Sequence, residues 1–342
     1  LEQGNSAVFF SATLLPVNYY KELLSGDLQE YAVYAHSPFH KENRLLMVAS
    51  DVSSRYTRRN RGEYEKVAEY IRKIAGGKAG NYMVFFPSYQ YMDQVAGILR
   101  EWEPDFDWTE QKSRMGERER EEFLEQFEQE RSRPFVALCV MGGVFSEGID
   151  LKEERLIGAV IVGTGLPQVN TEQEILKRFF DGKGKNGFDF AYQYPGMNKV
   201  LQAAGRVIRT ASDLGVIALL DERFLYSSSR SLFPREWDDY QVVNLNTVEA
   251  AVKDFWSGKE TEDEHKGLLV YCGNRGVQEP DRGGKPSVHH PERSDEVSPA
   301  GGGGGGNAPV SQDRQAVCPH PRGTDVRGKG GGNHPPGPGD GR

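Results

Sequence analysis

The stretch YMVFFPSYQYMDQVAGILR, residues 82–100, contains the two parts of a repeating structural unit. It opens with a short, continuous apolar run of the kind found in buried β-strands. Pro87 and Ser88 end that run. From Gln90 to Arg100 the apolar residues recur at helical spacing. The stretch therefore predicts a buried strand followed by an amphipathic helix.

The same alternation of apolar strands and amphipathic helices extends along the chain on both sides of this unit. We expect strands at Ala7–Ser11, Leu45–Ala49, Tyr82–Phe86, Phe135–Val140, Ile157–Val162 and Val216–Leu220. We expect helices at Val17–Leu24, Tyr64–Ile74, Gln90–Arg100, Glu117–Gln129, Thr171–Phe180, Met197–Arg209 and Val248–Trp256. Such alternation is typical of βαβ units, so the predicted fold is α/β, with a parallel sheet flanked by helices. Ligands of such sheets gather at the carboxyl ends of the strands.

The composition of the chain changes sharply near residue 264. From residue 265 onward Gly, Pro, Arg and His dominate, and residues 301–306 are six consecutive glycines. A segment of this composition cannot bury enough apolar surface to offset the entropy lost on ordering. We therefore predict a disordered, low-complexity tail over residues 265–342. Its origin stays open between an out-of-frame or unrelated GC-rich translation and a functional disordered tail.

The net charge of the globular part is strongly negative. The whole chain of 342 residues has a formal charge of −8, and the tail is slightly basic. An acidic domain does not attract a polyanion as a whole, so nucleic-acid contacts would need local basic or amide-lined strips. One basic cluster is Arg55, Arg58, Arg59 and Arg61. It could follow a phosphate backbone, or it could be part of a solvated loop.

The three cysteines, Cys139, Cys272 and Cys318, lie far apart and form no C-x-x-C pair. This spacing gives no support for a zinc site, an iron–sulfur cluster or a disulfide framework, so we expect no metal site in this chain. Cys139 lies in an apolar strand and is expected to be buried. The sequence contains no run of roughly 18 apolar residues and opens with no signal peptide, so we expect no membrane contact and a cytoplasmic location. Because the first residue is Leu, we interpret the native N-terminus as missing.

The sequence QAAGRVIR, residues 202–209, has the strongest chemical pattern. In the predicted helix Arg206 and Arg209 would lie on one side, and Gly205 would let a neighbouring surface approach. Two planar, permanently charged guanidiniums suit a triphosphate that gains charge during cleavage. The alternative is a pair of solvated arginines near a helix C-terminus.

A glycine-rich string, GGVFSEGIDL at residues 142–151, follows the strand Phe135–Val140. Its glycines permit a tight turn whose backbone amides can face a phosphate. Glu147 and Asp150 could then hold ribose, water or the arginines. The alternative is a glycine-rich turn with solvated carboxylates.

Two further strings come earlier in the chain: SAT at residues 11–13 and SYQYM at residues 88–92. Ser88 lies at a strand-to-helix junction, where its hydroxyl and the helix-start amides can bind a DNA phosphate. Tyr89 or Tyr91 could stack on a base. The alternative is that Ser88 caps the helix and the tyrosines pack.

Taken together, the four strings resemble superfamily 2 DNA helicases of the XPD/DinG family in order and spacing. SAT resembles motif III, SYQYM the motif IV region, residues 142–151 motif V and residues 202–209 motif VI. The resemblance implies that residues 16–264 form the second, RecA-like motor domain. It also implies that residues 1–15 are the end of the first domain, whose strand Ala7–Ser11 would be frayed or paired non-natively here.

The resemblance assigns roles to individual residues of this chain. Arg206 and Arg209 would act as arginine fingers on the γ-phosphate, together with Gln202. The other implied contacts are to ATP at Glu147, Gly148, Asp150 and Gly205, to the coupling pathway at Ser11 and Thr13, and to DNA at Ser88, Tyr89 and Ser146.

The globular part lacks two elements of a complete motor, a P-loop and an acidic pair for Mg²⁺. ATP and Mg²⁺ would therefore be shared with the missing N-terminal helicase domain. That domain and single-stranded DNA are the two expected partners of this chain. The family's iron–sulfur cluster would belong to that domain and not to this chain. Asp221 and Glu222 end an apolar strand as in a Walker B motif, but their place after motif VI argues against a magnesium role. We interpret Asp221 and Arg223 as loop or ion-pair residues, and Arg223 could also contact DNA. We expect the chain alone to be inactive.

Two other classes of function compete with the helicase interpretation. A catalytically inert RecA-like module that binds nucleic acid or a partner stays open. An unrelated α/β enzyme would need a nucleophile elbow or a metal cluster, and the sequence contains neither.

Overall fold

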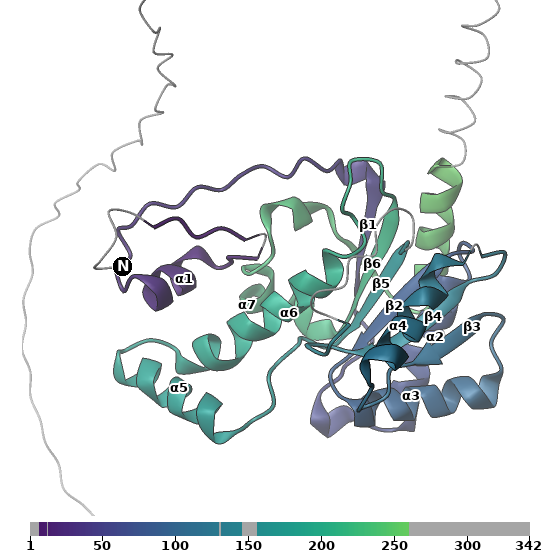
Figure 1. Cartoon of the computed structure of the whole chain (residues 1–342), viewed down its shortest axis with the longest axis horizontal. Helices are drawn as coiled ribbons and strands as arrows, with labels where there is room; N and C mark the ends of the chain where they lie inside the picture. Colours follow the sequence, from purple (N-terminus) through teal and green to yellow (C-terminus); the bar gives the residue numbers. More distant parts are fainter. Residues whose placement is uncertain (1–6, 12, 130, 146–155, 260–342) are drawn as a thin grey trace, which may run out of the picture. The chain divides into compact units, whose positions relative to one another are not determined.

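The computed structural model describes residues 7–11, 13–129, 131–145 and 156–259. These residues form a parallel seven-stranded sheet in the order β3-β4-β2-β5-β6-β1-β7 (Figure 1). The strands are β1 (Arg44–Ala49), β2 (Asn81–Phe86), β3 (Asp107–Glu110), β4 (Phe135–Val140), β5 (Gly158–Val162), β6 (Gly215–Leu220) and β7 (Gln241–Val243). The predicted α/β class, a parallel sheet flanked by helices, is confirmed.

The helices are α1 (Val17–Leu24), α2 (Arg61–Ala75), α3 (Tyr89–Trp102), α4 (Glu117–Glu125), α5 (Thr171–Gly182), α6 (Tyr194–Ala204) and α7 (Ser227–Arg230), followed by helical residues 248–259. Helices α2, α3 and 248–259 pack on one face of the sheet. Helices α4 and α6 pack on the other. Both faces are therefore covered, which is why the strands are continuous apolar runs.

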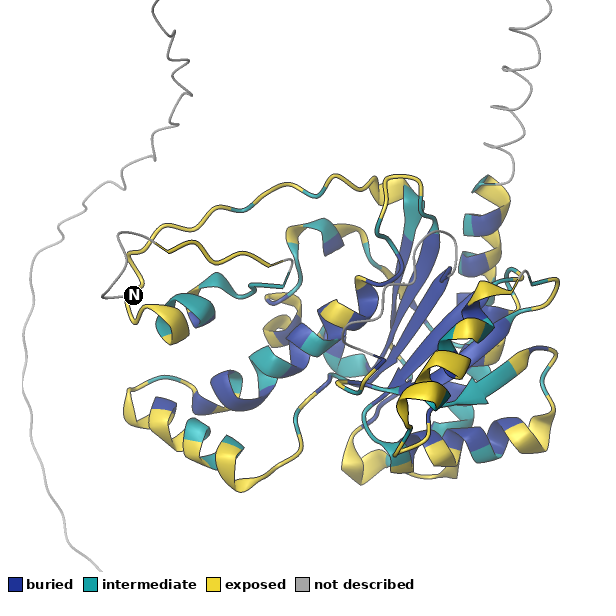
Figure 2. Ribbon diagram, in the orientation of Figure 1, coloured by how far each residue is buried: buried dark blue, intermediate teal, exposed yellow. Residues whose placement is uncertain are grey.

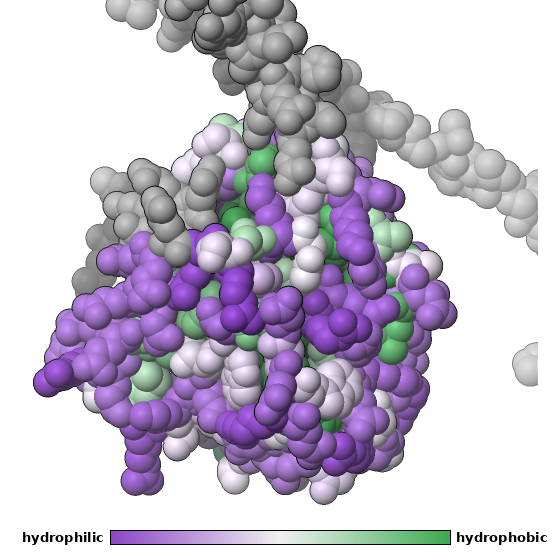
Figure 3. Space-filling view, turned by 90° about the vertical axis from the view of Figure 1, so that its right-hand side faces the viewer, coloured by the Kyte–Doolittle hydropathy of each residue, from purple (hydrophilic) through white to green (hydrophobic). Residues whose placement is uncertain are grey.

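Strand β1 shows how side chains divide between the two cores. Leu45 and Met47 point into the core under α2 and α3, whereas Leu46 and Val48 point into the core under α4 and α6. This alternation follows from the two-residue repeat of a strand. Figure 2 shows the central strands buried along their length, and the side of the molecule seen in Figure 3 is mostly hydrophilic.

Side-chain caps fix where two helices begin at the carboxyl edge of the sheet. The Asn60 side chain accepts a hydrogen bond from the Glu63 amide at 3.1 Å, at the start of α2. Ser88 accepts one from the Tyr91 amide at 3.2 Å, at the start of α3. Each cap satisfies a backbone N–H that has no partner inside the helix and contributes about 1 kcal/mol.

One glycine lets α6 begin beside the carboxyl end of β5. Gly165 has a φ of +68°, and a Cβ added there would lie 2.4 Å from the carbonyl oxygen of Gly196 near the start of α6. A larger residue is therefore excluded on two grounds, the left-handed backbone and the close approach. This contact positions the helix that leads to Arg206.

The structure corrects two of the predicted elements. Residues 7–11, which the structure describes, form no strand and are exposed, because none of the seven strands pairs with them. The helix predicted over Met197–Arg209 begins earlier, at Tyr194, and ends at Ala204. Two short strands, β3 and β7, were not predicted. The tail boundary near residue 264 and the tail itself lie outside the described residues.

Among the helices that the structure describes, no candidate membrane span is found.

Candidate functional site

The carboxyl ends of the parallel strands share one edge of the sheet, and several predicted site residues follow these ends directly. Ser88 and Tyr89 come after β2, and residues 141–145 come after β4. Asp221 comes after β6. This is the edge at which parallel α/β sheets bind their ligands.

Helix α6 packs on β5 and approaches the turn that follows β4. A Cβ added at Gly142, whose φ is +74°, would lie 3.2 Å from Cε of Lys199 on α6. Arg206, just beyond α6, is only 8% exposed. Burial raises the pKa of the Cys139 thiol on β4, and the Arg206 charge opposes that rise. The QAAGRVIR string thus lies beside the strand that leads into the glycine-rich string.

The two arginines do not share a helix face, which corrects the sequence-based geometry. Gly205 caps α6, and the next two amides bond three residues back, Arg206 to Ala203 at 3.4 Å and Val207 to Ala204 at 3.3 Å. Glycine is a poor helix former, so the helix ends there. Arg209 lies beyond this turn, half-buried, while Gln202 and Gly205 are exposed.

Asp213 organises the loop that contains Arg209, and sequence analysis did not single it out. One carboxylate oxygen accepts from the amides of Arg209 and Thr210, each at 2.7 Å, and the other accepts from the Thr210 hydroxyl at 2.7 Å. Burial alone would raise the pKa of Asp213, but these hydrogen bonds and the Arg209 charge lower it overall. The T-x-x-D pattern of residues 210–213 is the signal that could have revealed this turn.

In the motif IV region, two of the residues considered as nucleic-acid contacts have structural roles. Ser88 caps α3, as the structural alternative proposed, and Tyr91 is buried beneath the Tyr64 ring, with centroids 4.9 Å apart. Tyr89 is half-buried, and its hydroxyl accepts a hydrogen bond from the Gln111 side chain at 2.9 Å. Of the two tyrosines, Tyr89 is the one still available to a ligand.

Gln111 connects two parts of the site that sequence analysis treated separately. It is 4% exposed, and its side-chain oxygen accepts from the Val140 amide at 2.9 Å while its nitrogen donates to Tyr89. The start of α3 is thereby tied to the end of β4. Gln111 was missed because the strand that precedes it, β3, was not predicted.

A hollow of about 420 Å³ opens beside this bridge. It lies between the start of α3, the loop from β3 to α4, and the residues after β4. The polar and charged residues that line it are Tyr89, Gln111, Lys112, Ser113, Arg114 and Arg120. Lys112 has an ion pair with Glu119 at 3.5 Å, whereas Arg114 and Arg120 form no ion pair within the described part of the chain. The hollow therefore combines surplus positive charge with hydrogen-bonding groups, which suits an anionic ligand.

We expect Gln111→Leu to lower the free energy of unfolding by about 1 to 3 kcal/mol, because the Val140 amide loses its acceptor and Tyr89 loses a donor. Urea denaturation followed by circular dichroism would measure this. Gln90→Leu, at an exposed position on α3, is the matched control. An equal effect of the two substitutions would contradict the bridging role of Gln111.

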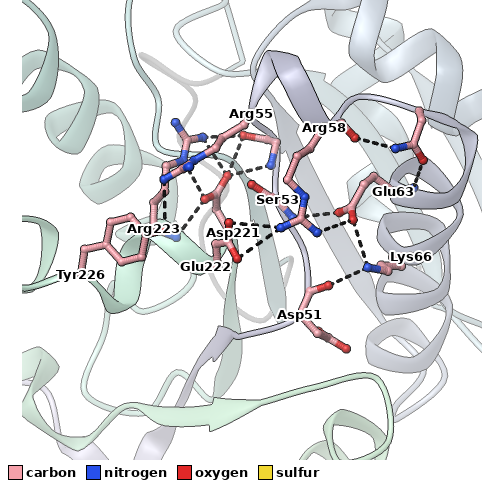
Figure 4. A network of polar contacts seen from close by, with 12 residues as sticks. Asp51, Ser53, Arg55, Arg58, Glu63, Lys66, Asp221, Glu222, Arg223 and Tyr226 are labelled. Atoms are coloured by element: carbon pink, nitrogen blue, oxygen red, sulfur yellow. Dashed lines mark hydrogen bonds and ion pairs between the residues drawn. The ribbon is translucent and has the colours of Figure 1, made fainter.

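A network of carboxylates and arginines occupies the same edge after β1 and β6 (Figure 4). Asp221 is fully buried and pairs with Arg223 at 2.8 Å, as expected for an ion-pair residue. It also accepts from the Ser54 amide at 2.9 Å and hydroxyl at 2.7 Å. Its carboxylate oxygens are thus occupied by donors from the protein. Within the described residues, no cluster of three His, Cys, Asp or Glu side chains suits a metal ion.

The predicted coupling residues lie close to α6. Ser11 and Thr13 hydroxyls are hydrogen-bonded to each other at 3.3 Å. Asn198 on α6 donates to the carbonyls of Thr13 at 3.2 Å and Leu15 at 2.9 Å when its amide is oriented to satisfy both of its atoms. Four other predicted site residues lie outside the described residues: Ser146, Glu147, Gly148 and Asp150.

Comparison with known proteins connects this geometry to a family. Residues 71–240 match the model of the helicase C-terminal domain. A probable ATP-dependent helicase of Methanocaldococcus jannaschii is 26% identical over 74% of this chain and 40% of its own length. The XPD/RAD3 helicase subunit of general transcription and DNA repair factor IIH from Saccharomyces cerevisiae is 30% identical over 68% of this chain and 32% of its own length. The ATP-dependent DNA helicase XPD of Sulfolobus acidocaldarius is 27% identical over 64% of this chain and 39% of its own length. The chain thus spans less than half the length of each of these relatives.

Proposed function

This chain belongs, through residues 71–240, to the helicase C-terminal domain family of XPD-type superfamily 2 helicases, and from that premise we propose that it is the second motor domain of an ATP-dependent DNA helicase. In this proposal the domain supplies arginine fingers and part of a track for single-stranded DNA. The observation that supports the proposal is that α6 approaches the turn after β4, where a Cβ added at Gly142 would lie 3.2 Å from Lys199 Cε. The start of one string, Gly142, and the helix that leads into the other are thus near each other although they are about 60 residues apart in the sequence, and we propose that both strings bind phosphate.

The nucleotide half of the proposed site would form only when a first domain faces this one. Arg206 and Arg209 would then stabilise the charge that develops on the γ-phosphate, with Gln202 and Gly205 on the exposed surface beside them. Glu147, Gly148 and Asp150 are the proposed further contacts to ATP. Mg²⁺ would neutralise phosphate charge during hydrolysis. In this proposal the other domain provides its ligands; among the described residues no group of three His, Cys, Asp or Glu side chains could hold a metal ion.

The nucleic-acid half of the proposed site uses the carboxyl edge near β2 and β4. Ser88 presents the first amides of α3, Tyr89 lines the cation-rich hollow, and Ser146 follows the glycine-rich turn. Arg114 and Arg120 supply the local positive charge that an acidic domain needs in order to hold a phosphate backbone. Ser11 and Thr13, close to α6 through Asn198, would couple the two halves.

Comparing ATP hydrolysis by this chain with that by the same chain preceded by a P-loop domain tests the proposal. The chain alone is expected to hydrolyse ATP no faster than the buffer background, because its sequence has no P-loop in the globular part. The two-domain protein is expected to hydrolyse ATP and to be stimulated by single-stranded DNA. A two-domain protein that binds DNA but hydrolyses no ATP would favour the inert binding module instead.

A further inference from the structure

The loop from β1 to α2, residues 50–60, is held rigidly at its base. The Ser53 amide donates to Glu63 at 3.0 Å, and the Ser54 amide donates to Asp221 at 2.9 Å. These two carboxylates belong to different elements, α2 and the segment after β6. The loop therefore presents its outer residues in a defined orientation.

Three of the four arginines of the basic cluster are engaged within the protein. Arg58 pairs with Glu63 at 2.9 Å and with Glu222 at 3.4 Å (Figure 4). Arg61 pairs with Glu65 and Glu101, and Arg59 donates to the Ser54 carbonyl at 3.2 Å. The charges of Arg58 and Arg61 are thus balanced locally, so the cluster does not form a continuous phosphate track.

The ion pairs of this loop do not explain why the ring of Tyr56 is exposed. Its side chain is 83% exposed, in the single turn of 3₁₀ helix Tyr56–Arg58. The guanidinium of Arg59 lies 5.5 Å from the centre of the Tyr56 ring and 5.3 Å from that of the buried Tyr91 ring. Cation–π contact with a side chain that is itself anchored holds the exposed ring in place.

Arg55 precedes Tyr56 in this loop and lies 5.6 Å from the centre of the Tyr226 ring. Arg55 is exposed, donates to the Tyr226 hydroxyl at 3.0 Å, and forms no ion pair among the residues that the structure describes. An exposed ring at Tyr56 and an adjacent cation without an ion pair in the described residues match the chemistry of single-stranded nucleic acid, whose bases stack while its phosphates need few charges. A duplex hides the faces of its bases and would gain nothing from such a ring.

We propose that Tyr56 is a stacking platform for an unpaired base, with Arg55 contacting the adjoining phosphate. This inference rests on the proposed function, since it extends the same nucleic-acid track along the carboxyl edge. In the sheet order β1 lies three strands from β2. Strands β1 and β2 are therefore about 14 Å apart at ~4.8 Å per strand, a span that a single bound strand of a few nucleotides can cross.

Binding of a fluorescein-labelled 20-nucleotide oligothymidylate to the full 342-residue chain, followed by anisotropy, tests this inference. Tyr56→Ala is expected to raise Kd by about tenfold, and Tyr56→Leu by a similar factor, whereas Tyr56→Phe retains binding because stacking needs only the ring. Tyr31→Ala, which removes a tyrosine that is 99% exposed, is the control.

The salt dependence of Kd distinguishes stacking from phosphate contact. Tyr56→Ala should leave the slope of log Kd against log salt unchanged, whereas Arg55→Ala should reduce it by about one. Tight binding by the unsubstituted chain that Tyr56→Ala leaves unaltered would overturn the stacking site alone. No binding of the oligonucleotide by the unsubstituted chain would overturn this inference together with the proposed DNA track.

Discussion

Arg206→Ala is expected to reduce DNA-stimulated ATP hydrolysis by the two-domain protein by about 10³-fold or more, the range found for arginine fingers in phosphoryl transfer. The physical reason is electrostatic. A guanidinium held beside β4 and buried within its own domain loses little solvation when the domains close, yet it can stabilise charge that appears only in the transition state. The expected loss therefore falls on kcat, with a smaller change in KM for ATP.

Because Arg206 is buried, its removal could act by unfolding, and the controls must separate the two effects. Circular dichroism and urea denaturation would show whether Arg206→Ala folds like the parent. Arg206→Lys retains charge without the planar fork and should stay strongly impaired. Arg118→Ala removes an arginine whose side chain is 90% exposed and should have full activity. Unchanged hydrolysis in a folded Arg206→Ala protein would remove this residue from the catalytic assignment.

The central strands could be predicted from the sequence for a physical reason. Strands β1, β2, β4, β5 and β6 are interior strands covered on both faces, so they are continuous apolar runs. The missed strands β3 and β7 lie at the two edges of the sheet. Asp107–Glu110 reads DWTE, half-exposed and polar, and edge strands of this kind have no strong apolar pattern.

The geometry around the proposed site could not be predicted from the sequence. The spacing of Arg206 and Arg209 suggested one helix face, because sequence periodicity does not reveal where tertiary contacts end a helix. That end depends on Gly205 and on Asp213, which binds the amides of Arg209 and Thr210. The bridge from Gln111 to Tyr89 and Val140 likewise joins residues from three elements, a relation that no local pattern contains.

Asp221→Asn is expected to lower the free energy of unfolding by about 3 kcal/mol, the low end of the range for breaking a buried ion pair. The carboxylate of Asp221 accepts five hydrogen bonds and donates none. Arg223 donates to it from Nε at 2.8 Å, from Nη2 at 2.8 Å and from its amide at 3.0 Å, and Ser54 adds two more donors. An asparagine would turn its own NH₂ group toward some of these donors. The low end applies because the Arg223 side chain is 20% exposed and can recover some hydration.

The pH dependence gives this prediction a signature that a simple packing defect lacks. Burial alone would raise the pKa of Asp221, but Arg223 and the Ser54 amide lower it overall. A carboxyl with a depressed folded-state pKa contributes stability above its unfolded pKa of about 4 and loses it as the pH falls through the folded value. The gap between the parent and Asp221→Asn in urea denaturation should therefore be widest at neutral pH and narrow in acid. Asp93→Asn, the same change at an exposed position on α3, should show almost no gap. A gap for Asp221→Asn that is constant with pH would mean that the ion pair with Arg223 is not its source, and that the loop presenting Tyr56 is anchored in another way.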